Sequence, residues 1–231
     1  MPTDSDRSNP KPWMQRLYVP SYSVSEAARY AQTPRSSVSY WHYSPGPGPL
    51  LPGKAEHDRL SYLQLVEVAF VAGFRRCGVK LPAIRRARAY LCERFQTDYP
   101  FAFHKFMTDG VHVLVDLEKW EKDEAGPTAR RVIVTDEGGQ LAWHRILADR
   151  FKEFVYEDSL ALKWFVRGKE SPILIDPRVA FGTPSVRGVP TWAIKESWKA
   201  GESLEGIQGN YQIPENEIRV ALEFENVPLA A

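Results

Sequence analysis

The chain has 231 residues, of which 43% are hydrophobic and 26% are charged. This balance is typical of a soluble globular protein with one large domain or two to three small ones. No apolar run is as long as a membrane span and no secretion signal opens the sequence, so we expect a cytoplasmic protein with no membrane partner. Its two cysteines, Cys77 and Cys92, fall in predicted helices, which also favours a reducing compartment.

The net charge of +1 conceals an uneven distribution. Residues 1–105 carry 15 Lys and Arg against 8 Asp and Glu (net +7), whereas residues 106–231 carry 15 against 21 (net −6). A basic half attracts the phosphate backbone of a nucleic acid. An acidic half suggests a different partner, or a basic one. Chance variation in surface composition produces similar imbalances, so charge is supporting evidence only.

The first segments predict a tail followed by a helix pair. We expect residues 1–16, which are polar and Pro-containing, to form a disordered arm. In residues 22–43, Ser23 can cap a first helix in a capping box with Glu26. Gln32-Thr33-Pro34 then ends that helix and opens a second.

The second helix of the pair has one apolar and one polar side. Val38 and Trp41 lie three residues apart and face inward, which leaves a polar outer face. This pattern is typical of a helix-turn-helix that enters a DNA major groove. Amphipathic helix pairs that bind nothing are also common in α-rich proteins. We interpret the Pro- and Gly-rich residues 44–60 as a wing, a strand–loop–strand excursion. The candidate DNA-binding residues are Arg35, Ser36, Ser37, Ser39, Tyr40, His42, Lys54 and Arg59.

Two longer helices follow. Ser61 and Gln64 predict a second capping box, and Gly78 ends the helix that it opens. The apolar stripe predicted for that helix consists of Leu63, Val66, Ala69 and Phe70. The next helix runs from about Pro82 to Phe95. Its outer face carries four arginines that are either solvated or contact a DNA backbone, namely Arg85, Arg86, Arg88 and Arg94.

This front part of the chain resembles the MerR-like helix-turn-helix family. The family pattern runs from an aliphatic and a small residue through Glu-x-Ala to a Thr-Leu-Arg-Tyr-Tyr/Trp run. Ser39 stands where the family usually carries Arg, which removes a phosphate contact. The resemblance implies a MerR-like winged helix-turn-helix DNA-binding domain over residues 17–98. The matching residues are Val24, Glu26, Ala27 and Ala28, then Ser37, Val38, Tyr40 and Trp41.

Residues 99–170 predict a mixed α/β middle region. Alternating residues around Asp109-Gly110 indicate a hairpin over 99–118, and a charged linker extends to about Arg131. A short strand at 132–134, a helix over 140–155 and a strand over 160–166 follow. The aromatic stripe of that helix is either core or a dimer seam, and it consists of Trp143, Leu147, Phe151 and Phe154.

Residues 171–231 predict a C-terminal three-helix domain. An extended segment at 173–175 leads through turn residues to helices at about 191–200, 204–211 and 214–224, a homeodomain-like arrangement. This segment holds 5 basic against 8 acidic side chains, which would repel phosphates. We therefore expect it to bind protein or to dimerise rather than to bind DNA. The predicted fold class is α+β and mainly α.

The run Asp176-Pro177-Arg178 to Arg187-Gly188, with Ala200-Gly201-Glu202-Ser203 and the last helix, resembles a small antitoxin family. Thr183 stands where the family commonly has Lys or Arg, and residues 187–190 are shorter than its usual run. The resemblance implies a VapB-type antitoxin of a type II toxin–antitoxin system, whose partner is a VapC-like ribonuclease toxin with a PIN domain.

Two functions follow from this resemblance. The front domain would bind promoter DNA as a homodimer or hetero-oligomer and repress the operon, and the C-terminal half would hold the toxin. Arg178 and Arg187 are the candidates to pair with the toxin's carboxylates. The alternative for Arg187 is that it only hydrogen-bonds its own turn.

The sequence predicts a protein that is not an enzyme. Its five histidines are scattered without metal-ligand spacing, and no nucleophile elbow, P-loop or dinucleotide fingerprint occurs. We therefore expect no catalytic residue, metal or cofactor. Two further interpretations remain open at this point. One is a stand-alone MerR-like regulator whose second half senses a ligand or dimerises, and the other is an interaction scaffold without DNA binding.

Overall fold

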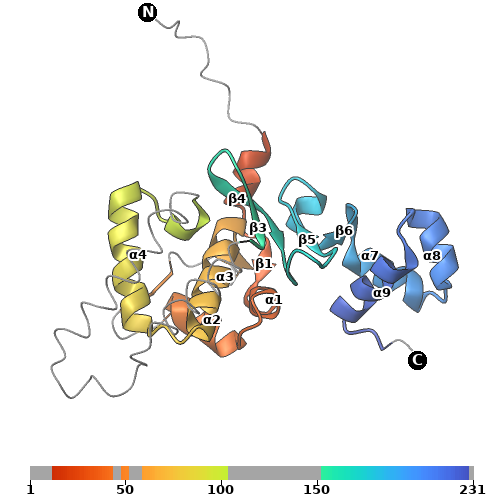
Figure 1. The fold of residues 1–231 in the computed structure, drawn as a ribbon, viewed down its shortest axis with the longest axis horizontal. Helices are drawn as coiled ribbons and strands as arrows, with labels where there is room; N and C mark the ends of the chain where they lie inside the picture. Colours follow the sequence, from red (N-terminus) through yellow and green to blue (C-terminus); the bar gives the residue numbers. More distant parts are fainter. Residues whose placement is uncertain (1–11, 44–47, 52–58, 104–151, 229–231) are drawn as a thin grey trace, which may run out of the picture.

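The computed structural model describes residues 12–43, 48–51, 59–103 and 152–228. In these ranges the chain is α+β and mostly helical, with two small antiparallel sheets (Figure 1). This coarse fold class agrees with the sequence prediction. No helix within the described ranges is both long enough and apolar enough to cross a membrane.

The described part begins with the 3-10 helix η1 (Pro12–Leu17), so the prediction of a disordered arm is wrong for residues 12–16. Leu17 is buried, and Trp13 packs against the core. These two apolar side chains hold the segment to the rest of the molecule. Residues 1–11 lie outside the described residues.

The predicted helix pair is confirmed as α1 (Val24–Tyr30) and α2 (Arg35–Tyr43). The capping box forms as expected: Glu26 N–H donates to Ser23 Oγ at 3.2 Å, and Ser23 N–H donates to Glu26 Oε2 at 2.7 Å. Helix α2 starts at Arg35, one residue later than predicted, and the Pro34 carbonyl accepts hydrogen bonds from the first turn.

The predicted wing is only partly recognisable. Strand β2 (Arg59–Leu60) closes it, but its antiparallel partner is β1 (Tyr22–Ser23), which precedes α1. Leu50 and Leu51 form no strand, because both of their N–H groups donate to the Trp41 carbonyl and fold the chain back onto α2. The remaining wing residues, 44–47 and 52–58, lie outside the described residues.

Helix α3 (Tyr62–Arg76) is the central element (Figure 1). The predicted capping box of Ser61 and Gln64 is confirmed, with Ser61 N–H donating to Gln64 Oε1 at 2.8 Å. The single apolar stripe is too narrow a prediction, because every residue from Tyr62 to Phe74 is buried. Neighbouring elements surround the helix: α1, α4 (Leu81–Phe95), η1 and the 3-10 helix η3 (Pro100–Ala102). Helix α4 confirms the predicted helix at 82–95, with Ile84, Ala87 and Leu91 buried.

The second sheet joins five short strands in sequential antiparallel order. They are β3 (Phe154–Glu157), β4 (Leu160–Phe165), β5 (Leu174–Ile175), β6 (Ser185–Val186) and β7 (Val189–Pro190). Strands β4 and β5 confirm the predicted strand at 160–166 and the predicted extended segment at 173–175.

The predicted helix over 140–155 is wrong at its end, since Phe154 and Val155 belong to β3. Phe154 stacks on Trp164 at 5.5 Å and on Phe70 at 4.9 Å, which favours pairing with β4 over continuing a helix. Lys152 and Glu153 form a turn instead of helix. Residues 140–151, the strand at 132–134, the linker and the hairpin around Asp109-Gly110 lie outside the described residues. In the described start of the hairpin segment, η3 takes the place of a strand.

The three predicted C-terminal helices are confirmed as α7 (Thr191–Lys199), α8 (Leu204–Tyr211) and α9 (Glu215–Phe224). Gly201, at φ +90°, follows α7 as expected of a helix stop. The helices pack on one another through fully buried Ile194, Ile207, Ile218 and Leu222. They form a group at the end of the molecule opposite α4 (Figure 1).

Candidate functional site

The outer face of α2 presents most of the candidate DNA-binding residues. Arg35 and Ser36 are exposed, Ser37 and Ser39 are half-buried, and Tyr40 is 47% exposed. His42 is buried, which corrects its predicted position on this face. Next to His42 the chain returns onto α2, since Leu50 N–H and Leu51 N–H donate to the Trp41 carbonyl, and helical spacing does not reveal this contact.

A hollow of about 580 Å³ lies where this face meets the neighbouring helices. One wall is the α1–α2 turn with the first turns of α2, and the other is the end of α3 with the start of α4. Polar side chains from α2 and guanidinium groups from α3 share the rim. The lining residues are Gln32, Thr33, Pro34, Ser36, Ser37, Tyr40, Trp41, Ala72, Arg75, Arg76 and Leu81.

Arg75 and Arg76, in the last turn of α3, were not among the predicted DNA-binding residues. Arg76 Nη1 donates to the Ala31 carbonyl at 2.7 Å and so joins the end of α3 to the turn of the helix pair. Arg75 Nη1 donates to the Val79 carbonyl at 2.6 Å and has no carboxylate within ion-pair distance in the described ranges. The hollow therefore carries positive charge next to the first turn of α2, where backbone N–H groups also favour an anion.

The two wing candidates do not extend this surface in the described residues. Arg59 is exposed, and its Nη1 donates to the Ser21 carbonyl at 2.7 Å across the β1–β2 pair. Lys54 lies outside the described residues.

The arginines of α4 make contacts within the protein. Arg85 Nη1 donates to the Gly48 carbonyl, Arg94 contacts the Tyr90 hydroxyl, and Arg88 Nε donates to Glu67 Oε2 at 3.1 Å. Glu67 is fully buried on α3, and it also accepts a hydrogen bond from Phe101 N–H at 2.8 Å. Burial raises the pKa of Glu67 to about 7, against the opposing effect of Arg88.

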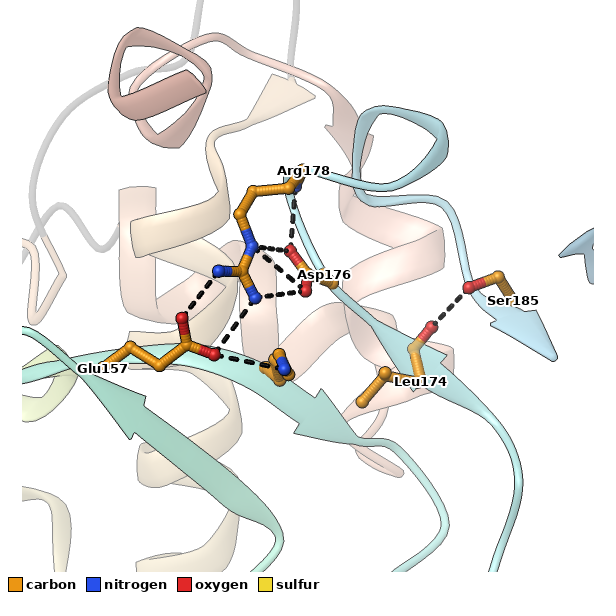
Figure 2. Close-up of polar contacts among 6 residues, drawn as sticks. Glu157, Leu174, Asp176, Arg178 and Ser185 are labelled. Atoms are coloured by element: carbon orange, nitrogen blue, oxygen red, sulfur yellow. Dashed lines mark hydrogen bonds and ion pairs between the residues drawn. The ribbon is translucent and has the colours of Figure 1, made fainter. Parts of the chain in front are cut away.

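Arg178, a candidate toxin contact, lies at the centre of an internal ion-pair cluster (Figure 2). Its guanidinium donates to Asp176 Oδ2 at 2.7 Å and to Glu157 Oε2 at 2.6 Å, and it lies 5.7 Å from the Trp13 ring centroid. Lys163 also pairs with Glu157 at 3.1 Å. Hydrogen bonds from Arg178 are the main cause of the low pKa of Glu157, about 2. The charge of Arg178 is thus neutralised by this chain's own carboxylates.

Arg187, the other candidate, lies in the tight turn between β6 and β7 at φ +49°. Its side chain is 56% exposed and makes a two-point contact with Glu217 of α9, at 2.8 Å for both nitrogen–oxygen pairs. The partner of Arg187 is therefore the last helix rather than the turn.

Helix α1 contacts the C-terminal helices directly. Tyr30 stacks on Phe224 with 5.9 Å between ring centroids, and Arg29 Nη1 donates to the Phe224 carbonyl at 2.9 Å. The Arg29 guanidinium also lies 3.5 Å from Glu225. Nearby, Tyr22 Oη donates to the Gly182 carbonyl at 2.9 Å. The helix pair and the C-terminal segment therefore share a packed junction.

The C-terminal segment matches a known family, and 90% of the chain matches a known protein. Residues 173–224 match the family described as Protein of unknown function (DUF433). Over 227 residues, 90% of this chain and 95% of the relative, the sequence is 23% identical to the protein named "Putative antitoxin VapB45" of Mycobacterium tuberculosis (strain ATCC 25618 / H37Rv). The chain resembles VapB45 along most of its length. The predicted likeness to VapB-type antitoxins is therefore confirmed.

A solved structure shares the fold. The X-ray crystal structure of Rv2018 from Mycobacterium tuberculosis superposes with a TM-score of 0.69 and 22% sequence identity. The match covers 90% of this chain and 99% of that chain. The likeness to VapB45 in sequence and to this structure in fold thus extends well beyond the DUF433 segment.

Proposed function

We propose that this chain is the antitoxin of a type II toxin–antitoxin system. In this role it neutralises a VapC-like ribonuclease toxin with a PIN domain by direct binding, and it represses its own operon by binding promoter DNA. The observation that carries the proposal is the similarity to a protein named as a putative antitoxin over 90% of the chain. The role is regulatory and requires no catalytic residue.

We assign DNA binding to residues 17–98 as a MerR-like winged helix-turn-helix domain. The exposed start of α2, next to the guanidinium groups of Arg75 and Arg76, supports this assignment. Arg35 and Tyr40 would enter the major groove, while Arg75 would contact a phosphate. A dimer would read an inverted repeat. The middle region, 99–170, would connect this domain to the next.

We assign toxin binding to residues 171–231, as a homeodomain-like three-helix domain. Its excess of acidic side chains supports a polypeptide partner rather than DNA. Of the two arginines proposed as toxin contacts, Arg187 is the more accessible, because its ion pair with Glu217 is partly exposed to solvent. Arg178 would have to leave two carboxylates before it could bind a partner.

An RNA-cleavage assay and a gel shift together test the proposal. The protein encoded by the adjacent reading frame is purified, and its cleavage of RNA is measured with and without the full-length chain. We expect an equimolar amount of the chain to abolish cleavage and charge reversal at Arg187 to weaken this inhibition. Cleavage that continues with the chain in excess contradicts the antitoxin role.

The gel shift uses DNA from upstream of the chain's own gene. We expect the combined substitutions Arg35→Ala and Tyr40→Ala to weaken binding at least tenfold, because each removes a groove contact. Arg75→Ala should weaken binding to DNA of any sequence. It should also reduce the slope of log K against log[salt] by the amount expected for about one phosphate contact. Arg219→Ala, on the acidic C-terminal segment, is the matched control. An unchanged shift with the α2 variants would exclude this helix as the DNA-reading element.

A further inference from the structure

Phe181 is the most exposed large apolar side chain in the described ranges, at 73%. It lies in the 3-10 turn η6 (Ala180–Gly182), within the DUF433 segment and directly after the Arg178 cluster. A phenyl ring left in water loses the free energy that burial would provide. Its exposure on an ordered turn therefore requires an explanation.

The backbone under Phe181 is strained. Ala180 lies at φ +44° and Phe181 at φ +55°, and both residues carry a Cβ that disfavours this left-handed region. Such conformations persist only where surrounding contacts fix them, and they concentrate at functional sites. Here two hydrogen bonds fix the turn: Gly182 N–H donates to the Val179 carbonyl at 2.9 Å, and Thr183 N–H donates to the Ala180 carbonyl at 3.1 Å.

A tyrosine from the front of the chain braces the same turn. Tyr22 Oη donates to the Gly182 carbonyl at 2.9 Å, and an added Cβ at Gly182 would lie only 2.1 Å from that oxygen. Tyr22 contacts the turn at Gly182 and so fixes the position of Phe181, the residue before it. The Phe181 ring lies mostly in solvent. The fold thus presents Phe181 as a fixed aromatic group.

A positively charged side chain lies over the Phe181 ring. The guanidinium of Arg16, from η1, lies 4.7 Å from the Phe181 ring centroid. Helix η1 is itself fixed beside the turn, because Leu17 is buried and Arg178 lies over Trp13 (Figure 1). Arg16 is exposed, and no described carboxylate lies within ion-pair distance of it. Arg178 and Arg187, by contrast, are already paired with carboxylates of this chain.

We propose that Phe181 and Arg16 together anchor the polypeptide partner of this protein. An exposed, preorganised aromatic ring beside an exposed arginine that pairs with no carboxylate of the described ranges has the composition of an interface hot spot. The matching surface is an apolar pocket that admits a phenyl ring, with a carboxylate at its rim to receive the guanidinium. On the proposed function, this partner is the ribonuclease toxin, and the inference rests on that function.

Charge argues against nucleic acid at this surface. A single-stranded base could stack on an exposed Phe, but nucleic-acid binding needs several neutralised phosphates. The segment that carries Phe181 holds 8 acidic against 5 basic side chains between residues 171 and 231. A partner that contributes carboxylates complements Arg16, whereas phosphates would meet mostly negative charge in this segment.

The test measures the affinity of full-length variants for the purified product of the adjacent reading frame. Phe181→Gly removes the ring and also relieves the left-handed strain, so it should fold at least as well as the parent chain. Arg16→Glu reverses the charge at an exposed site. We expect each substitution to raise the dissociation constant at least tenfold. Tyr90→Ala is the control: it removes another exposed aromatic side chain, 45% exposed, from α4, outside the segment assigned to toxin binding, and should change affinity less than twofold.

Wild-type affinity in both Phe181→Gly and Arg16→Glu overturns the anchor and leaves the antitoxin proposal standing. Failure of the unaltered chain to bind the adjacent gene product rejects the proposed function, and the anchor falls with it. Sedimentation of the chain alone identifies a different occupant: if Phe181→Gly abolishes self-association, the surface belongs to a second copy and this proposal is wrong. A loss of binding to upstream DNA in the same variants likewise overturns it.

Discussion

At the scale of single residues, Glu67 illustrates how burial controls a charge. Its carboxylate lies on the central helix α3, contacts Arg88 of α4 and accepts a hydrogen bond from the Phe101 N–H. One side chain therefore connects α3, α4 and η3. Removal from water outweighs the attraction of Arg88, so the pKa of Glu67 rises from an ordinary value of 4.5 to about 7.

This raised pKa predicts a pH dependence of stability. The folded state holds the proton more tightly than the unfolded chain, so the contribution is fully present below pH 4.5 and is lost as pH rises through 7. The substitution Glu67→Gln should remove this decline, changing the difference in unfolding free energy between pH 5 and pH 8 by about 2 kcal/mol. Urea unfolding at both pH values measures it. Glu93→Gln, on the exposed side of α4, is the control, and identical pH profiles for the parent and Glu67→Gln would contradict the prediction.

At the scale of elements, Arg178 joins three segments that are distant in sequence. It pairs with Glu157 of β3 and with Asp176 after β5 (Figure 2). It also lies over the Trp13 ring of η1. Asp176 has a side chain only 5% exposed, so it depends on this guanidinium for compensation of its charge. The cluster fixes η1 and the turn that presents Phe181 against the second sheet.

We expect Arg178→Met to destabilise the fold by about 2 kcal/mol, because it leaves a buried carboxylate without its partner. Arg219→Met is the matched control. It breaks an ion pair with Glu215 whose side chains are 48% and 47% exposed, and should cost no more than about 0.5 kcal/mol. Chemical denaturation of both variants measures the difference. Equal stabilities would show that the cluster is dispensable for folding.

Local features of the elements were predictable, and long-range ones were not. The capping boxes of Ser23 and Ser61 depend on residues three positions apart, so spacing was sufficient to find them. The burial of α3 on all sides depends on segments that pack around it from elsewhere in the chain. Phe154 left its predicted helix because Trp164 and Phe70 stack on it.

For the candidate site residues, too, positions set by local spacing were predictable, whereas positions set by distant contacts were not. The exposed positions of Arg35, Ser36 and Tyr40 follow from the helical period of α2. The burial of His42 does not, and neither does the return of the chain onto Trp41 at Leu50 and Leu51. Nothing in the local sequence around Arg178 indicates that Glu157, 21 residues earlier, will neutralise it.

At the scale of the whole molecule, the helix pair and the C-terminal helices are one packed body in the described ranges. Phe224 is enclosed by Tyr30 on one side and by the guanidinium groups of Arg29 and Arg167, at 4.7 and 5.6 Å from its ring centroid. Arg29 adds a hydrogen bond to the Phe224 carbonyl and an ion pair with Glu225. Helix α1 therefore packs against both α2 and α9.

This junction predicts coupled protection from hydrogen exchange. The substitution Arg29→Ala should speed amide exchange in both α1 and the last turn of α9, by a factor of about ten if roughly 1.4 kcal/mol of local stability is lost. Exchange in α8, which lies at the outer end of the C-terminal helices, away from α1 (Figure 1), should not change. Arg35→Ala, at the first residue of α2, is the control, and it should leave amide exchange in α9 unchanged. Faster exchange in α1 alone would show that the two ends open independently.

The contact between Gly182 and Tyr22 has an evolutionary consequence. The two positions are 160 residues apart, yet a single methyl group at one would overlap the hydroxyl oxygen of the other. A relative that carries alanine or any larger residue at position 182 must therefore have a smaller side chain at position 22. Among homologous sequences the residues at positions 22 and 182 should therefore covary, because a larger residue at one position requires a smaller one at the other.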